Sequence, residues 1–338
     1  MQLFIDSYGS YLSVKDQMFC VKPKNSDAHL LPVRQVNAIF LSKGVGVSTN
    51  ALMLAIENQI PVVLIDGIDR PKGIIWTQAY GSIVTIRKKQ ALFAQHPRGF
   101  DWVRQQLLRK IAAQYGVLQE IRQSPLWQQA DFANEYQKAD RVINSVSEQL
   151  AAWSPPDNAA DFEQQAPMLR GWEGNASRHY FRTIAHCLPT AFYFDKRSRH
   201  PAFDAFNALL NYLYGMLYVM VEMALVKAGI DPYMGILHAD EYQKITMVYD
   251  CIEPYRPWAD ITAIELCQQN RINPDAFVEI EGEGVRLTTQ KNIVVSAFLD
   301  FLNQKTMYNG RQMRRNLQID LNAQLLATQM RNFDSTDT

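Results

Sequence analysis

The spacing of apolar residues changes near residue 80, and this change most constrains how the chain can fold. Before that point, short runs rich in β-branched and aromatic residues alternate with turn residues such as Tyr8-Gly9-Ser10, which predicts strands. After it, apolar residues recur every three to four positions, as in amphipathic helices. We therefore expect an α+β protein, with a β-rich, sandwich-like N-terminal domain (residues 1–81) and a larger all-α C-terminal domain (residues 82–333).

The first domain should contain one helix among its strands, because Ser48 or Thr49 can cap a segment with an apolar side that includes Ala51 and Leu54. In the second domain, Ser154-Pro155-Pro156 ends one helical stretch and begins a loop. The pattern after this loop is again helical to about residue 330. The predicted strands cover residues 3–5, 11–14, 17–21, 31–34, 37–41, 62–65 and 73–77.

Residues 203–228 form an apolar stretch about as long as a membrane span. The stretch also contains Asp204, Asn207, Asn211 and Glu222, and charged groups at such positions are costly in hydrocarbon. We therefore predict a buried central helix and no membrane partner.

The four cysteines, Cys20, Cys187, Cys251 and Cys267, form no C-x-x-C pair. The N-terminus also lacks a basic segment followed by an apolar run, the pattern of a secretory leader. We expect the cysteines to be buried thiols of a reduced, cytoplasmic protein rather than a disulfide framework or a zinc site.

Charge is distributed unevenly, although the formal net charge is zero. Residues 1–110 contain 14 Lys and Arg against 7 Asp and Glu, whereas the remainder contains 20 against 27. Such asymmetry indicates a polyanion-binding face on the basic part, and ordinary surface scatter explains it equally well. Within this part, Lys88 and Lys89 are candidate phosphate contacts.

Three separate segments carry the candidate catalytic residues. Glu173 lies between Gly171 and Gly174 in a predicted helix, and His238 follows an apolar pair in a turn-rich stretch. Asp250 and Glu253 are three residues apart and share a helical face, so they repel one another unless a cation or a proton compensates. Each segment is weak evidence alone: Glu173 is more simply a solvated helix residue, His238 a hydrogen-bonded half-buried side chain, and the two acids an exposed face near a helix end. Together they offer carboxylates and an imidazole, a donor set that suits Mg²⁺ or Mn²⁺.

These segments resemble the signature blocks of a known family. Gly-Trp-Glu-Gly-Asn-Ala-Ser-Arg at 171–178, Gly-Ile-Leu-His at 235–238 and Tyr-Asp-Cys-Ile-Glu-Pro-Tyr-Arg-Pro at 249–257 are similar to those of the CRISPR-associated integrase, the larger subunit of the spacer-acquisition complex. The order, the spacing and the β-then-α layout agree over essentially the whole chain. Some family members have Asp in place of Glu253, and either residue supplies a carboxylate.

The resemblance implies a metal site formed by Glu173, His238 and Glu253, with Asp250 as a nearby catalytic acid and Mg²⁺ or Mn²⁺ as the cofactor. It further implies insertion of spacer DNA into a CRISPR array, through attack of a 3′-hydroxyl on a phosphodiester. The implied partners are double-stranded DNA (spacer precursor and CRISPR repeat), a second copy bound through the β-domain, and a small second adaptation subunit. The arginines expected to contact phosphate are Arg178, Arg199 and Arg256.

Two other functions remain open at this stage. The same metal site would serve a structure-specific repair nuclease that cuts branched DNA without joining it. A non-catalytic DNA-bridging scaffold, in which the acids are an inert surface, would also fit the sequence. Divalent metal binding and the type of DNA product distinguish these functions.

Overall fold

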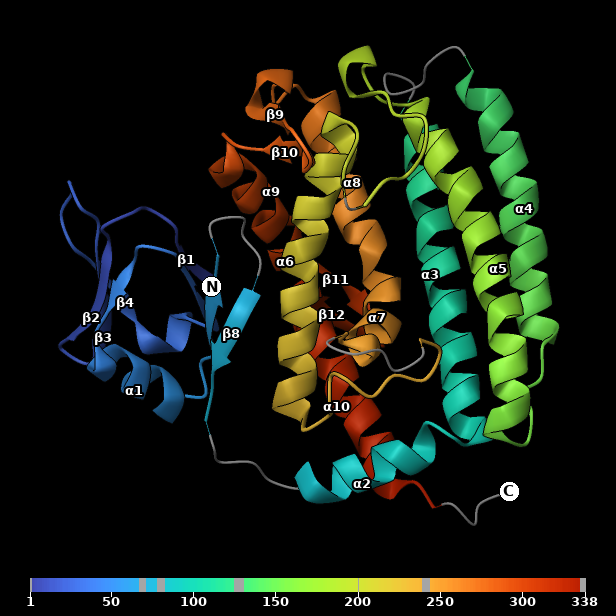
Figure 1. Cartoon of the computed structure of the whole chain (residues 1–338), viewed down its shortest axis with the longest axis horizontal. Helices are drawn as coiled ribbons and strands as arrows, with labels where there is room; N and C mark the ends of the chain where they lie inside the picture. Colours follow the sequence, from blue (N-terminus) through green and yellow to red (C-terminus); the bar gives the residue numbers. More distant parts are fainter. Residues whose placement is uncertain are drawn as a thin grey trace. The chain divides into compact units, whose positions relative to one another are not determined.

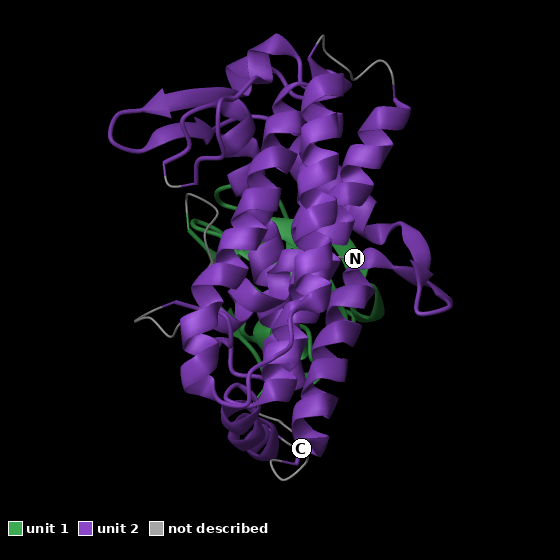
Figure 2. Ribbon diagram, turned by 90° about the vertical axis from the view of Figure 1, so that its right-hand side faces the viewer, with its two compact units in different colours: residues 1–81 green, residues 82–338 purple. Residues whose placement is uncertain are grey.

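The computed structural model divides the chain into two compact units, residues 1–81 and 82–338 (Figure 2). The first unit is built mainly from strands and the second mainly from helices, which confirms the predicted α+β class. The structure describes residues 2–66, 71–77, 83–124, 131–199, 201–238 and 244–334.

The N-terminal unit contains two four-stranded sheets. The first has the order β1-β5-β7-β8, with β8 alone antiparallel to its neighbour. Its strands are β1 (Gln2–Ile5), β5 (Ala38–Ser42), β7 (Val62–Ile65) and β8 (Pro71–Ile75). The second sheet has the order β4-β3-β2-β6, and its strands are β4 (His29–Pro32), β3 (Met18–Lys22), β2 (Tyr11–Lys15) and β6 (Gly46–Val47).

One helix, α1 (Thr49–Glu57), lies between β6 and β7, as the sequence predicts. Ser48 caps it, because the side-chain oxygen accepts a hydrogen bond from the backbone N–H of Ala51 at 3.2 Å. The helix contacts β2 and covers part of the core with Ala51 and Ala55.

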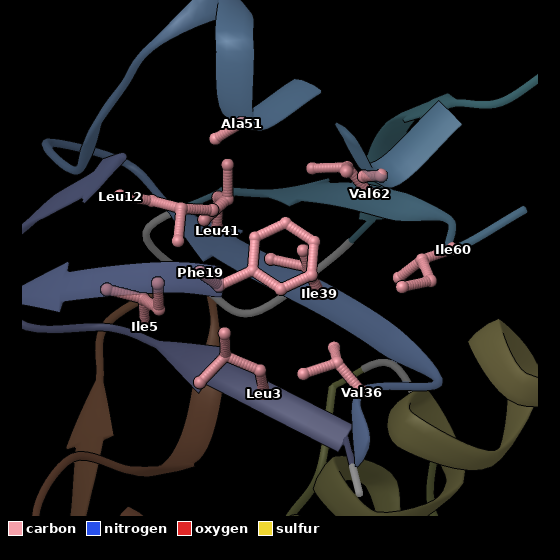
Figure 3. Packing of buried hydrophobic residues seen from close by; sticks show 11 residues of the cluster. Leu3, Ile5, Leu12, Phe19, Val36, Ile39, Leu41, Ala51, Ile60 and Val62 are labelled. Atoms are coloured by element: carbon pink, nitrogen blue, oxygen red, sulfur yellow. The ribbon is translucent and has the colours of Figure 1, made fainter. Parts of the chain in front are cut away.

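The core of this unit forms where alternate residues of both sheets point toward each other (Figure 3). Ile39 and Leu41 of β5 face this cluster, and Leu12 and Phe19 of the second sheet join it. Because side chains alternate across a strand, one face of each sheet supplies the apolar set.

The C-terminal unit contains long helices, of which α3, α4 and α5 pack side by side (Figure 1). A short 3₁₀ turn, η4, links α7 directly to α8. The helices are α2 (Ile83–Phe93), α3 (Pro97–Gln123), α4 (Phe132–Ala152), α5 (Ala159–Ala185), α6 (Ala205–Ala228), α7 (Thr246–Ile252), η4 (Glu253–Tyr255), α8 (Arg256–Gln268), α9 (Lys291–Asn303) and α10 (Arg315–Asn332).

Helix α6 is the apolar stretch noted in the sequence. By length and composition it could cross a membrane, and 67% of its most apolar window is buried within the fold. Asp204 caps its start by accepting from the backbone N–H of Asn207 at 2.7 Å, and Gly229 ends it with a φ of 82°. The helix packs against α8 and α10, as expected of a core helix.

Two hairpins interrupt the helical unit, and the sequence analysis did not predict them. They are β9–β10 (Phe277–Ile280 with Gly284–Leu287) and β11–β12 (Lys305–Tyr308 with Arg311–Arg314). The second hairpin turns at Asn309-Gly310, where both residues have positive φ. That dipeptide is a strong signal for a two-residue hairpin turn. The region after residue 154 is therefore mainly, but not continuously, helical.

All four cysteines are free thiols, and the predicted burial is confirmed for three of them. Cys20, Cys187 and Cys267 are buried, and Cys251 is half-buried. Burial raises the pKa of Cys187 to about 12, which keeps this thiol protonated and unreactive.

Candidate active site

Two of the predicted acids, Glu173 and Glu253, converge on one cation, the ammonium of Lys110. Nζ of Lys110, in α3, contacts Oε1 of Glu173 in α5 and Oε2 of Glu253 in η4. The Lys110, Glu173 and Glu253 side chains are 6%, 23% and 10% exposed, so both ion pairs are largely shielded from water. Three elements that are distant in sequence thus bring two carboxylates to a single positive charge.

Glu253 is held in its ionised form. Burial by itself raises the pKa of this carboxyl, but the charges of Arg256 and Lys110 outweigh burial and lower the pKa to about 2. Nε of Arg256 donates to Oε1 of Glu253 at 2.9 Å. Among the described residues, none gives Oε2 a hydrogen bond of regular geometry, so the contact of this buried oxygen is the ion pair with Lys110.

Lys110 remains charged in this setting, and its partner Glu173 is held in place by neighbours. Burial lowers the pKa of the lysine, whereas the charges of Glu253 and Glu173 raise it, and the net result is a raised pKa. Oε1 of Glu173 accepts from Oγ of Ser177 at 2.7 Å, and Nε2 of Gln114 donates to the same Oγ at 3.2 Å. The turn of α5 below Glu173 therefore fixes its carboxylate.

The other two predicted residues, His238 and Asp250, form a second pair. Nδ1 of His238 lies 2.6 Å from Oδ1 of Asp250, in α7. The same carboxylate accepts the backbone N–H groups of Ile236 at 2.6 Å, Leu237 at 3.0 Å and His238 at 3.3 Å. Asp250 thus gathers the loop before α7 around one buried carboxylate. Because an ionised carboxylate only accepts, Nδ1 is the nitrogen that donates to Asp250, and Nε2 is the ring nitrogen that Asp250 does not engage.

A row of aromatic contacts joins the two pairs. The His238 ring meets Tyr249 edge to face, with centroids 5.7 Å apart, and Tyr249 meets Tyr218 in the same way, also at 5.7 Å. Nη2 of Arg256 donates to the hydroxyl of Tyr218 at 2.7 Å, while Nε of the same arginine contacts Glu253. The imidazole and the Glu253 carboxylate therefore belong to one continuous cluster.

A deeper layer supports Arg256. Its guanidinium lies over the Tyr214 ring, 4.9 Å from the centroid. The hydroxyls of Tyr214 and Tyr180 donate to Asp260 at 2.7 and 2.8 Å. Burial raises the pKa of Asp260 to about 6, although these two hydrogen bonds partly oppose it. Tyr180 is fully buried in this layer.

The remaining predicted residues lie in different settings. Arg256 is buried in the cluster just described, whereas Arg178, Arg199 and Lys88 are exposed. Nζ of Lys89 donates to the backbone carbonyl of Phe333, directly after α10. A positive charge at this C-terminal end of the helix interacts favourably with the helix dipole. Contact of these arginines and lysines with DNA stays a prediction. His200, which follows Arg199 in the sequence, lies outside the described residues.

The sequence analysis missed Lys110, Tyr218 and Asp260. A signal for Lys110 exists, because it shares the face of α3 on which Leu107 and Ile111 are buried. A lysine at a core position of an amphipathic helix needs an acidic partner. Which acid would partner it depends on how α3 packs against α5 and η4, and the sequence does not show that packing.

The donor chemistry of this cluster partly fits the divalent ion that the family resemblance implies. Both acids already share one cation, the ammonium of Lys110. The buried Oε2 of Glu253 contacts this cation rather than a regular hydrogen-bond donor, and oxygen atoms that bind a metal ion also contact a cation directly. His238 presents Nε2 as a possible nitrogen ligand. Among the described residues, however, no three His, Cys, Asp or Glu side chains lie close enough to hold a metal ion. The structure thus gathers two of the three implied ligands.

Known proteins of similar sequence belong to one family. A family model described as CRISPR associated protein Cas1 matches residues 3–299. CRISPR-associated endonuclease Cas1 1 from Archaeoglobus fulgidus is 25% identical over 93% of this chain and 91% of its own length. CRISPR-associated endonuclease Cas1 2 from Saccharolobus solfataricus is 28% identical over 78% of this chain and 74% of its own length.

Solved structures show the same fold. A Cas1 protein from Thermotoga maritima superposes with a TM-score of 0.76 at 20% identity, over 98% of this chain and 97% of its own. A casposase bound to its integration product gives a TM-score of 0.80 at 18% identity, over 100% of this chain and 94% of its own. Because the family model covers most of the residues and the fold agrees throughout, this chain belongs to the family of CRISPR-associated Cas1 proteins.

Proposed function

We propose that this chain is a metal-dependent DNA endonuclease and integrase of CRISPR adaptation, which inserts spacer DNA into a CRISPR array. The observation that supports this proposal most is the convergence of two shielded carboxylates, Glu173 and Glu253, on one cation beside an imidazole held by a buried acid. The relatives from Archaeoglobus fulgidus and Saccharolobus solfataricus are named endonucleases. The casposase of similar fold was solved with an integration product.

The side chains supply the parts that phosphoryl transfer needs. Glu173, Glu253 and Nε2 of His238 would hold Mg²⁺ or Mn²⁺, which when bound stabilises the negative charge that develops on the phosphate oxygens. Asp250 fixes the tautomer and the orientation of the imidazole. Arg256 keeps Glu253 ionised and in place. With the 3′-hydroxyl of a DNA end as nucleophile the product is a joined strand, and with water it is a cut strand.

We further propose that the C-terminal unit carries this chemistry, and that the chain acts as a homodimer with a small second subunit. A structure of similar fold, titled as a Cas6-RT-Cas1–Cas2 complex, has a TM-score of 0.74 over 99% of this chain and 35% of that longer chain. The N-terminal unit is the proposed dimerisation surface. We assign three candidate contacts to it, Phe40, Ile74 and Trp76. Phe40 is buried, with its ring centroid 4.1 Å from that of Phe4, whereas Ile74 and Trp76 are half-buried.

A single reaction tests the proposal. The purified chain, its small partner and Mn²⁺ are incubated with a DNA fragment and a supercoiled plasmid that carries a CRISPR repeat, and the joined strands are counted. Glu173→Gln and His238→Ala should each lower joining at least about 100-fold, as expected when a metal ligand is lost. Glu163→Gln, an exposed glutamate of the same helix α5, is the matched control and should react normally.

The products separate the competing functions. Joined half-site intermediates support an integrase, whereas cut branched DNA without joining supports a repair nuclease. A chain that binds DNA but neither cuts nor joins it in Mn²⁺ would be a scaffold. Full activity in both site variants would refute the proposed site.

A further inference from the structure

Lys110 occupies the position that a divalent ion shared by Glu173 and Glu253 would have to enter. We infer that its ammonium is an internal counter-ion, which holds the two carboxylates together in the metal-free protein and competes with the divalent ion for them. The inference rests on the proposed metal dependence and adds a positioning residue to it. The sequence analysis assigned no role to this lysine.

The charges of the cluster balance without any added ion. Glu173 and Glu253 contribute two negative charges, and Lys110 and Arg256 contribute two positive charges. A divalent ion on the same oxygens would leave two positive charges in excess if both basic groups stayed in contact with them. Like charges in a shielded site repel strongly. One of the two basic groups must therefore withdraw when the ion binds.

Lys110 is the group that is able to withdraw. Arg256 is fixed by three neighbours, because it donates to Glu253 and to Tyr218 and lies over the Tyr214 ring. Lys110 contacts the acids only through the end of a flexible stem, and it is the group that touches both of them. The Lys110 ammonium, and not the Arg256 guanidinium, thus lies at the point that both carboxylates face.

The same geometry gives Lys110 a positive role. Without a cation, two shielded carboxylates that face one point repel each other, and one of them would turn away. The ammonium prevents this, so the metal-free protein keeps both carboxylates directed at the same place. The lysine therefore lowers the affinity of the site for the metal, and it keeps the two carboxylates ordered when no metal is bound.

The test compares Lys110→Met, which keeps the length of the side chain and removes its charge, with the wild type after chelation. Mn²⁺ binding is measured by titration calorimetry, and the melting temperature is measured with and without Mn²⁺. The variant should bind Mn²⁺ at least about tenfold more tightly, which corresponds to about 1.4 kcal/mol. It should melt at a lower temperature than the wild type without metal, and Mn²⁺ should raise its melting temperature by more.

Two further variants keep the result interpretable. Lys110→Arg retains the charge and should bind Mn²⁺ no more tightly than the wild type does. Lys138→Met removes a lysine that pairs with Glu135 at 2.8 Å in α4, and it should leave Mn²⁺ binding unchanged. If Lys110→Met folds only in Mn²⁺, chelation should unfold it under conditions in which the wild type stays folded, and this result also supports the inference.

Unchanged, weaker or absent Mn²⁺ binding in Lys110→Met would overturn the inference, as would tighter binding in Lys110→Arg equal to that of the methionine variant. The proposed function fails by a different result. If the wild-type protein binds Mn²⁺ but neither cuts nor joins DNA, the proposed integrase function is refuted. The calorimetric titrations still measure the competition between Lys110 and Mn²⁺ in that case.

Discussion

Replacing Asp250 by asparagine separates the positioning of His238 from the stability of the fold. The carboxylate accepts from three backbone N–H groups and from Nδ1 of the imidazole. Asparagine keeps one accepting oxygen for the two shorter backbone bonds, those of Ile236 and Leu237. Its NH₂ group would then face Nδ1 and donate to it, which forces the proton of the imidazole onto Nε2. In that tautomer, His238 has no lone pair on Nε2 to offer a metal.

The size of each effect follows from these contacts. Asp250→Asn loses the charge but keeps most of the bonds, so we expect the free energy of unfolding to fall by about 1–2 kcal/mol. That corresponds to a decrease of roughly 2–8 °C in melting temperature for a unit of this size. Mn²⁺ affinity should fall by about 10–100-fold, the usual effect of losing the partner that orients a metal-ligating histidine. Asp250→Ala should cost more stability, about 3–5 kcal/mol, because the loop loses every one of these acceptors.

The assay combines urea unfolding, Mn²⁺ titration and strand joining on the same preparations. Asp300→Asn, an exposed aspartate in α9, is the control and should change none of the three. A folded Asp250→Asn protein with wild-type Mn²⁺ affinity and wild-type joining would refute the reasoning, because the tautomer of His238 would then not matter.

Three other predictions follow from the same cluster and its surroundings. The pKa of Asp260 is raised to about 6, so the folded protein keeps a proton that the unfolded chain releases near pH 4; stability should fall by about 2 kcal/mol as pH rises from 4 to 7, and Asp260→Asn should abolish this fall in urea midpoints. Gly174→Ala should raise stability by up to about 1 kcal/mol, since no atom of the described chain lies within 4 Å of the added Cβ (helix backbone and adjacent residues excepted), and it should slow joining if DNA approaches there. Lys88→Ala should reduce the salt dependence of DNA binding by about one unit of slope if this lysine contacts phosphate, and an unchanged slope would make it an ordinary exposed charge.

The fold could be predicted as far as local periodicity determines it. The strands of the N-terminal unit and the buried helix α6 follow from patterns that a few neighbouring residues set. The hairpins β9–β10 and β11–β12 were missed because each is a short segment between helices, and the helical spacing on both sides set the interpretation of the whole region. The dipeptide Asn309-Gly310 was the available signal, and it concerns turn geometry rather than periodicity.

The site could be predicted only in part, because its acids were visible and their partners were not. Glu173, His238 and Glu253 were found through short motifs that resemble a family. Lys110 belongs to no such motif. Its function depends on the packing of α3 against α5 and η4, which is a tertiary property. Arg256 was predicted to bind phosphate from its type, yet the structure places it against Glu253 and two tyrosines.

The two acids Asp250 and Glu253 show why spacing alone was insufficient. Three residues apart on one helical face, they were expected to repel unless a cation or proton compensated both. In the structure α7 ends at Ile252 and a 3₁₀ turn begins at Glu253, and each acid has its own compensation. Backbone N–H groups and Nδ1 of His238 stabilise the Asp250 carboxylate by hydrogen bonds, whereas the positive charges of Lys110 and Arg256 offset the charge of Glu253. Asp250 therefore uses both of its carboxylate oxygens to hold the loop before α7. Glu253 instead contacts the ammonium of Lys110, a cation that a metal ion could replace.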